Sequence, residues 1–385
     1  MQKRLDQLDG MRFIMALTIV FSHMEFLFSG IYHYSYGNFY YQYVRNSTVA
    51  VDYFFMLSGF GIFYSAVAKQ SVQKVSTAWP LSFARGKIKK IYRPYVISLL
   101  ITVPYMFYIN LQNHSLVSTV VRNGALFCID LSLLQSLFGT SMISHSFNSV
   151  GWFLSALFIA YLLCPLFVRM AASLLNKKTH YMIVILVDSI LLLLLASTVG
   201  VLLDRKLKIG GFGEFDDFFY GSPYVRCFYV WIGMLVSVLY IKTKKMGTDL
   251  KSGIGENVFF VISLAYFFSR QTILDLTGNN LIIVRALDVV NAALILIMLA
   301  YGRGFVSKLV SNKRLVLLGR DAMYLYLFHY AADLYIPHLF LQKNIYFGQV
   351  TGLVEAALYW ACALAVSFLA WKIGGRRTAE KKTIS

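Results

Sequence analysis

The chain has 385 residues, of which 58% are hydrophobic and only 14% are charged, and its mean hydropathy is +0.62. A chain this apolar is not a soluble enzyme with one or two cores, so its composition indicates a membrane protein. Its formal net charge is +18. Basic proteins often bind nucleic acid, but here the Lys and Arg residues are spread over polar loops, as membrane topology alone requires. We therefore expect no nucleic-acid partner.

Ten apolar runs are long enough to cross a bilayer, for which about 20 residues are needed. They are residues 12–29, 49–68, 91–109, 150–170, 181–201, 224–241, 255–270, 281–301, 316–338 and 351–371. If the N-terminus is cytoplasmic, most Lys and Arg residues fall in cytoplasmic segments, which is the usual bias. The sequence thus predicts an all-α polytopic membrane bundle of about ten transmembrane helices, with both termini cytoplasmic.

The stretch 116–139 is apolar but contains Arg122 and Asp130. An eleventh crossing there would place the later basic segments outside, so we expect a re-entrant or interfacial helix at the outer face. The whole chain, residues 1–385, is expected to be one integral-membrane domain with a basic tail at 372–385 and no appended soluble domain. Its four cysteines are far apart and form no CxxC pair, so neither a disulfide framework nor a metal site is expected.

Arg12 and His23 stand out in the first apolar run. His23 follows Arg12 by eleven positions, close to three helical turns, so both side chains should lie on one face, about 16 Å apart along the axis. Ionisable groups inside a span are costly and usually face a cavity or a partner. A functional pair is one interpretation. In the other, Arg12 reaches the inner headgroups as a topology anchor and His23 forms a hydrogen bond between helices.

The second apolar run begins with VDYFFMLSGF, residues 51–60. Asp52 should enter the membrane at about the depth of His23, where its carboxylate would hold the imidazole in one tautomer. Alternatively, Asp52 caps the N-terminus of the helix. Ser58 and Gly59 supply a hydroxyl and a bare backbone, which allow close helix packing or a kink.

A basic segment precedes the third apolar run. It is FARGKIKKIYRPY, residues 83–95, and its cations are Arg85, Lys87, Lys89, Lys90 and Arg93. Such a cluster commonly sets topology or anchors the protein to anionic lipids. It would also suit a polyphosphate, since Lys87 and Lys90 are three residues apart and share a helix face.

Two further residues are candidates. Trp152 begins the apolar stretch that contains WFLSALFIAYLLCPLF, and an aromatic belt at the outer interface is an adequate explanation for it. His329 lies in the middle of a predicted span, at the end of LGRDAMYLYLFHY. A lone membrane histidine usually makes a structural hydrogen bond, and a catalytic role is the alternative.

Together these motifs resemble the acyltransferase 3 family of membrane acyltransferases. The motifs are LDGMR followed by SH, VDYFFMLSGF, the basic segment ending in IYRPY, WFLSALFIAYLLCPLF and LGRDAMYLYLFHY, over about residues 5–335. The resemblance implies a ten-helix domain in the cell membrane, here a bacterial inner or plasma membrane. Such proteins transfer an acyl group, usually acetyl, from cytoplasmic acyl-CoA to a hydroxyl, often of a glycan or lipid-linked sugar at the outer side. The implied partners are acyl-CoA, that acceptor and membrane lipids; no metal and no particular oligomeric state are implied.

The resemblance also assigns residues. Arg12 and His23 correspond to the functional arginine and histidine of the family's first helix. The family's basic pair before the third helix, typically arginine-x-x-arginine, corresponds to Lys87 and Lys90. Lysine at both positions is a departure, and it leaves open whether Arg85 shares the binding of phosphate.

The chemistry of O-acyl transfer explains why these residue types are needed. A base must take the hydroxyl proton, and a positive group must stabilise the oxyanion or hold the donor. His23 suits the first task because its neutral form is favoured in an apolar site, and Arg12 suits the second because it is always charged. We therefore expect an O-acyltransferase of the cell envelope with His23 as the general base. A transporter or exporter of an envelope precursor or acylated metabolite, and a non-catalytic partner in envelope synthesis, are the alternatives.

Overall fold

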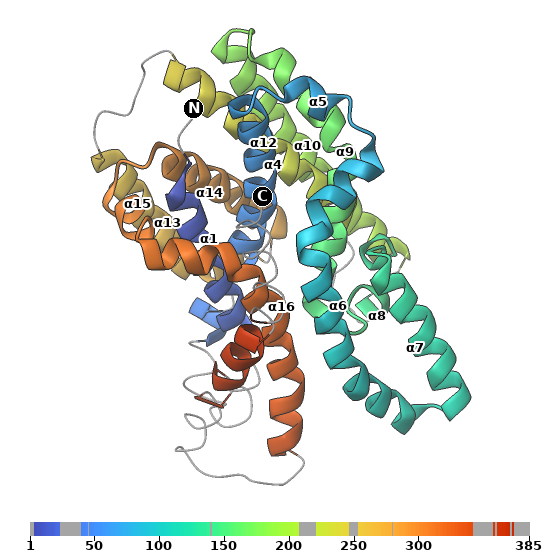
Figure 1. Ribbon diagram of the computed structural model, residues 1–385. Helices are drawn as coiled ribbons and strands as arrows, with labels where there is room; N and C mark the ends of the chain where they lie inside the picture. Colours follow the sequence, from blue (N-terminus) through green and yellow to red (C-terminus); the bar gives the residue numbers. More distant parts are fainter. Residues whose placement is uncertain are drawn as a thin grey trace.

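The computed structural model describes residues 4–23, 40–44, 46–138, 141–207, 221–245, 253–278, 280–341, 357–358, 360–369 and 372. All regular structure in these ranges is helical (Figure 1). The predicted all-α bundle is therefore confirmed. In Figure 1, α6 and α7 form one edge of the molecule and α13 and α15 the opposite edge, with α1, α4 and α14 between them.

In chain order, the helices are α1 (Asp6–Ser22), η1 (Tyr40–Val44), α4 (Thr48–Ala68), α5 (Val72–Ser76), α6 (Pro80–Asn113), α7 (Leu116–Leu131), η2 (Gln135–Leu137), α8 (Ser141–Ser144), η3 (Ser149–Gly151), α9 (Trp152–Leu174), α10 (Thr179–Leu207), α12 (Pro223–Lys245), α13 (Ile254–Leu276), α14 (Leu281–Tyr301), α15 (Phe305–Val310) and α16 (Lys313–Leu341). A short apolar helix, Trp360–Leu369, follows them.

Seven helical segments are long and apolar enough to cross a membrane. They are Gln42–Ala68, Pro80–Asn113, Ser149–Leu174, Thr179–Val199, Pro223–Lys245, Ile254–Leu276 and Leu281–Tyr301. Each coincides with one predicted span. Of the other three, 316–338 lies within α16, 12–29 is described only as far as residue 23, and 351–371 is described mainly as Trp360–Leu369. A multi-pass helical membrane protein is thus confirmed, and the total of ten crossings stays a prediction.

The ends of two helices show how local sequence sets these boundaries. At the start of α14 the side chain of Asn280 accepts a hydrogen bond from the backbone nitrogen of Ile282 (3.2 Å), which satisfies a donor that has no partner within the helix. After the end of α14, Gly302 has φ +65°, a left-handed conformation that glycine adopts without a Cβ clash. Pro80 begins α6, where its missing N–H is not needed.

Glycines bring two pairs of helices unusually close together. A Cβ on Gly59 of α4 would overlap the carbonyl of Val230, and a Cβ on Gly233 of α12 would overlap the carbonyl of Met56. In the same way, a Cβ on Gly319 of α16 would overlap the carbonyl of Asp9 in α1. Small residues at such contacts let membrane helices pack backbone against backbone. The predicted role of Gly59 in close packing is therefore confirmed.

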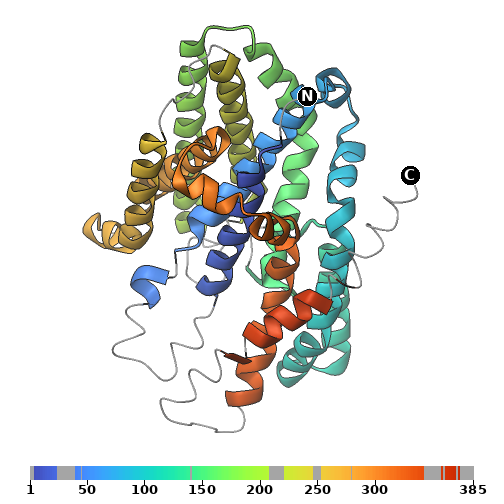
Figure 2. The ribbon, with the colours of Figure 1, turned by 60° about the vertical axis from the view of Figure 1, so that its left-hand side comes forward.

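The stretch 116–139 forms α7 and part of the connection to α9. The side chain of Asn110 donates to Asn123 (2.7 Å), and the Tyr95 hydroxyl donates to the carbonyl of Asp130 (3.0 Å). These contacts show that α7 turns back along α6, as Figures 1 and 2 also show. With 16 residues, α7 is about 24 Å long, short for a crossing, and it is not among the candidate spans.

Candidate active site

Two histidines from opposite ends of the sequence meet between α1 and α16. His23 is the C-terminal cap of α1, and His329 lies within α16. Their ring centroids are 5.1 Å apart. The two helices run in the same direction, because Asp9 contacts Gly319 near their starts and the histidines meet further along. His329 is fully buried and His23 is half-buried.

Hydrogen bonds to backbone carbonyls indicate the tautomer of each ring. Nδ1 of His23 lies 2.8 Å from the carbonyl oxygen of Ile19, and Nδ1 of His329 lies 3.2 Å from that of Leu325. Because a carbonyl only accepts, each Nδ1 is assigned as the N–H donor. In a neutral imidazole the lone pair is then on Nε2. The Nε2 atom of His23 is therefore the basic one.

The start of α9 lies beside this histidine pair. Tyr326 is 6.2 Å from the His329 ring, and its hydroxyl donates to the carbonyl of Val150 (2.8 Å). Asn148 donates to both Ser98 Oγ (2.8 Å) and the carbonyl of Leu327 (3.0 Å). These bonds join α6, the connection before α9 and α16 around the pair.

The same connection contacts a buried carboxylate at the end of α7. The Ser146 hydroxyl lies 3.0 Å from both carboxylate oxygens of Asp130, which is almost completely buried. Burial raises the pKa of Asp130 to about 7. Its contacts fix the end of α7 rather than face the histidines.

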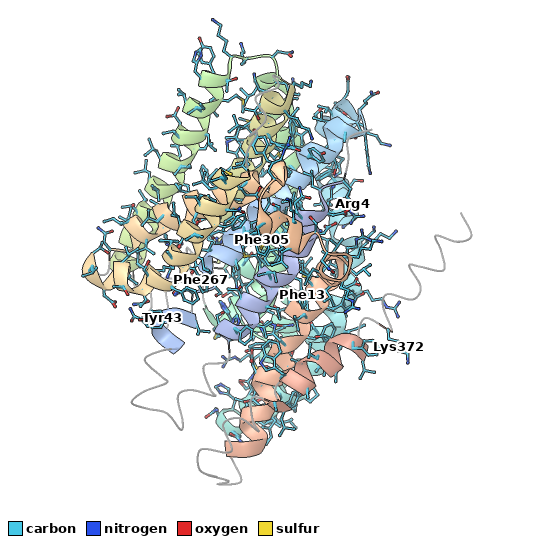
Figure 3. All side chains as sticks on the ribbon, turned by 90° about the vertical axis from the view of Figure 1, so that its left-hand side faces the viewer. Arg4, Phe13, Tyr43, Phe267, Phe305 and Lys372 are labelled. Atoms are coloured by element: carbon cyan, nitrogen blue, oxygen red, sulfur yellow. The ribbon has the colours of Figure 1, made fainter. Side chains whose placement is uncertain are left out.

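Arg12 lines a groove at the N-terminal end of α1. The groove has a volume of about 500 Å³ between α1 and α4, and its cations are Arg4, Arg12 and Lys69. In Figure 3, Arg4 and Phe13 mark the stretch of α1 that contains Arg12. Arg12 pairs with Asp9 (2.7 Å), and Asp9 also pairs with Arg4 (2.5 Å). Since 38% of the Arg12 side chain is exposed, it is accessible to an anion in the groove.

Polar groups of α4 and α9 lie inward of this groove. Arg12 is within electrostatic range of the hydroxyls of Tyr53 and Tyr161. Ser58 lies close to Tyr161, and its hydroxyl donates to the carbonyl of Phe54 (2.9 Å). Ser58 is therefore part of a polar contact between α4 and α9 near Arg12.

Asp52 has a different partner from the one predicted. Its Oδ1 accepts from Nη1 of Arg226 in α12 (2.5 Å), and both side chains are almost completely buried. Asp52 Oδ2 has no hydrogen-bond partner among the described residues. The expected contact between Asp52 and His23 is therefore wrong. The capping interpretation is wrong too, because Ser47 is the N-terminal cap and Asp52 lies in the second turn of α4.

Trp152 packs on the same buried ion pair. The guanidinium of Arg226 lies 5.2 Å from the Phe55 ring, 5.6 Å from the Trp152 ring and 4.8 Å from the Tyr229 ring. Cation–π contacts of this kind stabilise a charge away from water. Trp152 is only 7% exposed, so the prediction of a lipid-facing aromatic belt is wrong for it. In the sequence, the signal for this ion pair is Arg226, an arginine just after the start of the apolar run 224–241.

The basic segment divides between two faces of α6. All five of its cations are exposed, and all lie within the helix rather than in the loop before it. Arg85 and Lys89 line a groove of about 630 Å³ beside α7 and α9. Lys87 points elsewhere, with its Nζ 5.2 Å above the Phe83 ring, and Lys90 shares that face by its three-residue spacing. The structure therefore does not join Arg85 to Lys87 and Lys90 in one site.

No group of three or more His, Cys, Asp or Glu side chains that would hold a metal occurs in the described ranges. A cofactor would meet cations instead, in the α1–α4 groove and on the two faces of α6.

These contacts describe a multi-pass helical membrane protein in which two histidines meet between α1 and α16, with a cationic groove at the N-terminal end of α1. The chain belongs to the acyltransferase 3 family: the family's sequence profile, described as an acyltransferase domain, matches residues 5–372. The family resemblance of the motifs is thus confirmed. The chain is 36% identical over 123 residues to acyltransferase MdmB of Streptomyces mycarofaciens. The aligned residues make up 32% of this chain and 29% of that relative. No solved structure matches the chain significantly.

Proposed function

We propose that the protein transfers an acyl group, most simply acetyl, from cytoplasmic acyl-CoA to a hydroxyl of a glycan or lipid-linked sugar at the outer side of the membrane. The observation that carries this proposal is the histidine pair. Its orientation leaves Nε2 of His23 as a base inside an apolar bundle. Membership of an acyltransferase family supports the same class of reaction.

In the proposed reaction His23 acts on the acceptor. Nε2 takes the proton of the acceptor hydroxyl while the hydroxyl oxygen attacks the thioester carbonyl. The carbon–sulfur bond then breaks, and the proton on His23 passes to the departing thiolate, which leaves as CoA. The products are an ester and a free thiol, so His23 returns to its neutral form. His329 positions the His23 ring through their direct contact.

The donor is proposed to bind at the cytoplasmic end. The cations of the α1–α4 groove, together with Lys87 and Lys90, suit the phosphates of CoA. Arg12 lies about 16 Å from His23 along α1, a separation that the extended phosphopantetheine arm would bridge. Asp52 takes no part in this reaction, since its carboxylate meets Arg226.

The test is the variant His23→Gln, which keeps much of the volume and hydrogen bonding of the side chain but removes the base. We expect turnover in reconstituted protein to fall about 10²–10⁴-fold, the usual contribution of a general base. Acyl-CoA binding, measured by calorimetry, should stay unchanged. His180→Gln is the matched control, because His180 is exposed at the start of α10. Retention of more than about a tenth of turnover by His23→Gln would overturn the assignment.

A further inference from the structure

The groove between α6, the end of α7 and α9 has two chemically different parts. One end carries the two cations Arg85 and Lys89, which are four residues apart and therefore share one face of α6. The rest of the lining is mainly apolar and includes Ile88, Leu131 and Phe158. A groove of about 630 Å³ is in the usual size range of small-molecule sites, roughly 300–1,000 Å³.

The apolar wall of this groove is held in place by hydrogen bonds. The Tyr92 hydroxyl donates to the carbonyl of Leu131 (2.8 Å), which ties the end of α7 to α6. Leu133 has φ 56°, a left-handed conformation that is rare for a bulky residue. It is kept there by its own N–H, which donates to the carbonyl of Asp130 (2.9 Å), and by its carbonyl, which accepts from Ser155 (2.8 Å). The wall is therefore formed before any ligand arrives.

We propose that this groove binds an anionic phospholipid of the cytoplasmic leaflet. The headgroup phosphate lies between Arg85 and Lys89, and an acyl chain follows the apolar wall past Ile88 and Leu131 toward Phe158. Basic pockets between membrane helices on the cytoplasmic side suit anionic headgroups, and the apolar remainder suits a hydrocarbon chain. Charge complementarity at one end and an apolar wall at the other thus point to the same ligand.

The geometry favours a lipid over the nucleotide of CoA. No lining residue comes from α1 or α16, the helices that carry the two histidines. Lys87 and Lys90 lie on another face of α6 and do not line the groove. A donor bound here would therefore be separated from the proposed base by α6 itself. The lipid site does not depend on the proposed transfer reaction, since its tests use no turnover.

The first test is native mass spectrometry of the detergent-solubilised protein, titrated with phosphatidylglycerol or with phosphatidylcholine. Wild type should bind one phosphatidylglycerol much more tightly than phosphatidylcholine. Arg85→Gln/Lys89→Gln should weaken phosphatidylglycerol binding by about thirtyfold, from the usual contribution of each basic residue to anionic-lipid binding. Lys87→Gln/Lys90→Gln removes the same charge from another face of α6, so it should leave that binding within about threefold. Equal losses in the two variants, or no loss in the first, would overturn the proposal.

The second test needs no variant and so does not depend on the folding of one. Phosphatidylglycerol with a photoreactive diazirine on its acyl chain is crosslinked to wild-type protein, and the labelled peptides are mapped. We expect labels at residues 131–133 and at Phe158, with loss of labelling when unmodified phosphatidylglycerol is added in excess. Labels confined to other segments would contradict the site. Displacement of the lipid by acetyl-CoA would assign the groove to the donor instead.

Discussion

The α4–α12 contact and the α1–α16 contact both depend on glycine packed against a neighbouring backbone. They differ in the polar groups that they hold. In both, glycine lets one helix approach the backbone of the other. The α4–α12 contact buries a charged pair, Asp52 and Arg226, under aromatic rings. The α1–α16 contact holds two imidazoles, one of them half-buried at the end of its helix. The charged pair therefore fixes the bundle, whereas His23, at the C-terminal end of α1, stays partly exposed and is able to exchange a proton.

Breaking the charged pair should cost the most stability. Asp52→Asn leaves Arg226 buried without its counter-charge, which should cost about 3–5 kcal/mol. Thermal unfolding in detergent measures the loss. The double variant Asp52→Leu/Arg226→Met replaces the pair by apolar side chains and should recover most of the stability. A double variant as unstable as the single one would show that the charges themselves are required.

A smaller loss should follow from closing the α4–α12 contact. Gly59→Ala places a Cβ against the carbonyl of Val230, and overpacking of this kind typically costs about 1–3 kcal/mol. Gly61→Ala is the matched control on the same helix, because a Cβ there meets nothing within 4 Å. The unfolding temperature should fall for Gly59→Ala and stay level or rise for Gly61→Ala. Equal shifts would mean that the close approach of the two helices is unimportant.

These two contacts also show what a sequence can and cannot predict. Helix type and the positions of seven spans follow from apolar run length, and the structure confirms them. The role of Gly59 in close packing is predictable because a bare backbone has few other uses in a span. The shared face of Lys87 and Lys90 follows from their spacing alone, which is a local property.

Contacts between residues far apart in the chain cannot be predicted from such local patterns. The contact of His23 with His329 depends on the parallel packing of α1 and α16, which no local pattern encodes. The prediction for Asp52 names the wrong partner because depth in the membrane says nothing about which neighbouring helix a side chain faces. The prediction for Trp152 is wrong for the same reason: an aromatic residue at a span end faces lipid or protein according to tertiary packing.

Substitutions at the proposed donor-binding end should have smaller effects than substitutions at either helix contact. Lys87→Gln/Lys90→Gln should raise the apparent KM for acyl-CoA by about two- to thirtyfold, since exposed charge pairs contribute only about 0.2–1 kcal/mol each. The KM should also become less sensitive to salt, because two screened interactions are lost. Lys177→Gln/Lys178→Gln makes the same charge change at exposed residues between α9 and α10 and should leave the KM unchanged. An unchanged KM in Lys87→Gln/Lys90→Gln would mean that these two lysines only set the membrane topology.

Transfer across the membrane is tested most directly in oriented proteoliposomes. Acyl-CoA with one radiolabel in the acyl group and another in the adenine is supplied to the cytoplasmic face. An extract of cell-envelope glycans and lipid-linked sugars is held at the outer face. We predict that the acyl label appears on the outer acceptor while the adenine label stays with the cytoplasmic face, and that Arg12→Ala lowers this transfer. Adenine label crossing together with the acyl label would contradict the proposed reaction and indicate a transporter, and acylation confined to the cytoplasmic face would contradict its geometry.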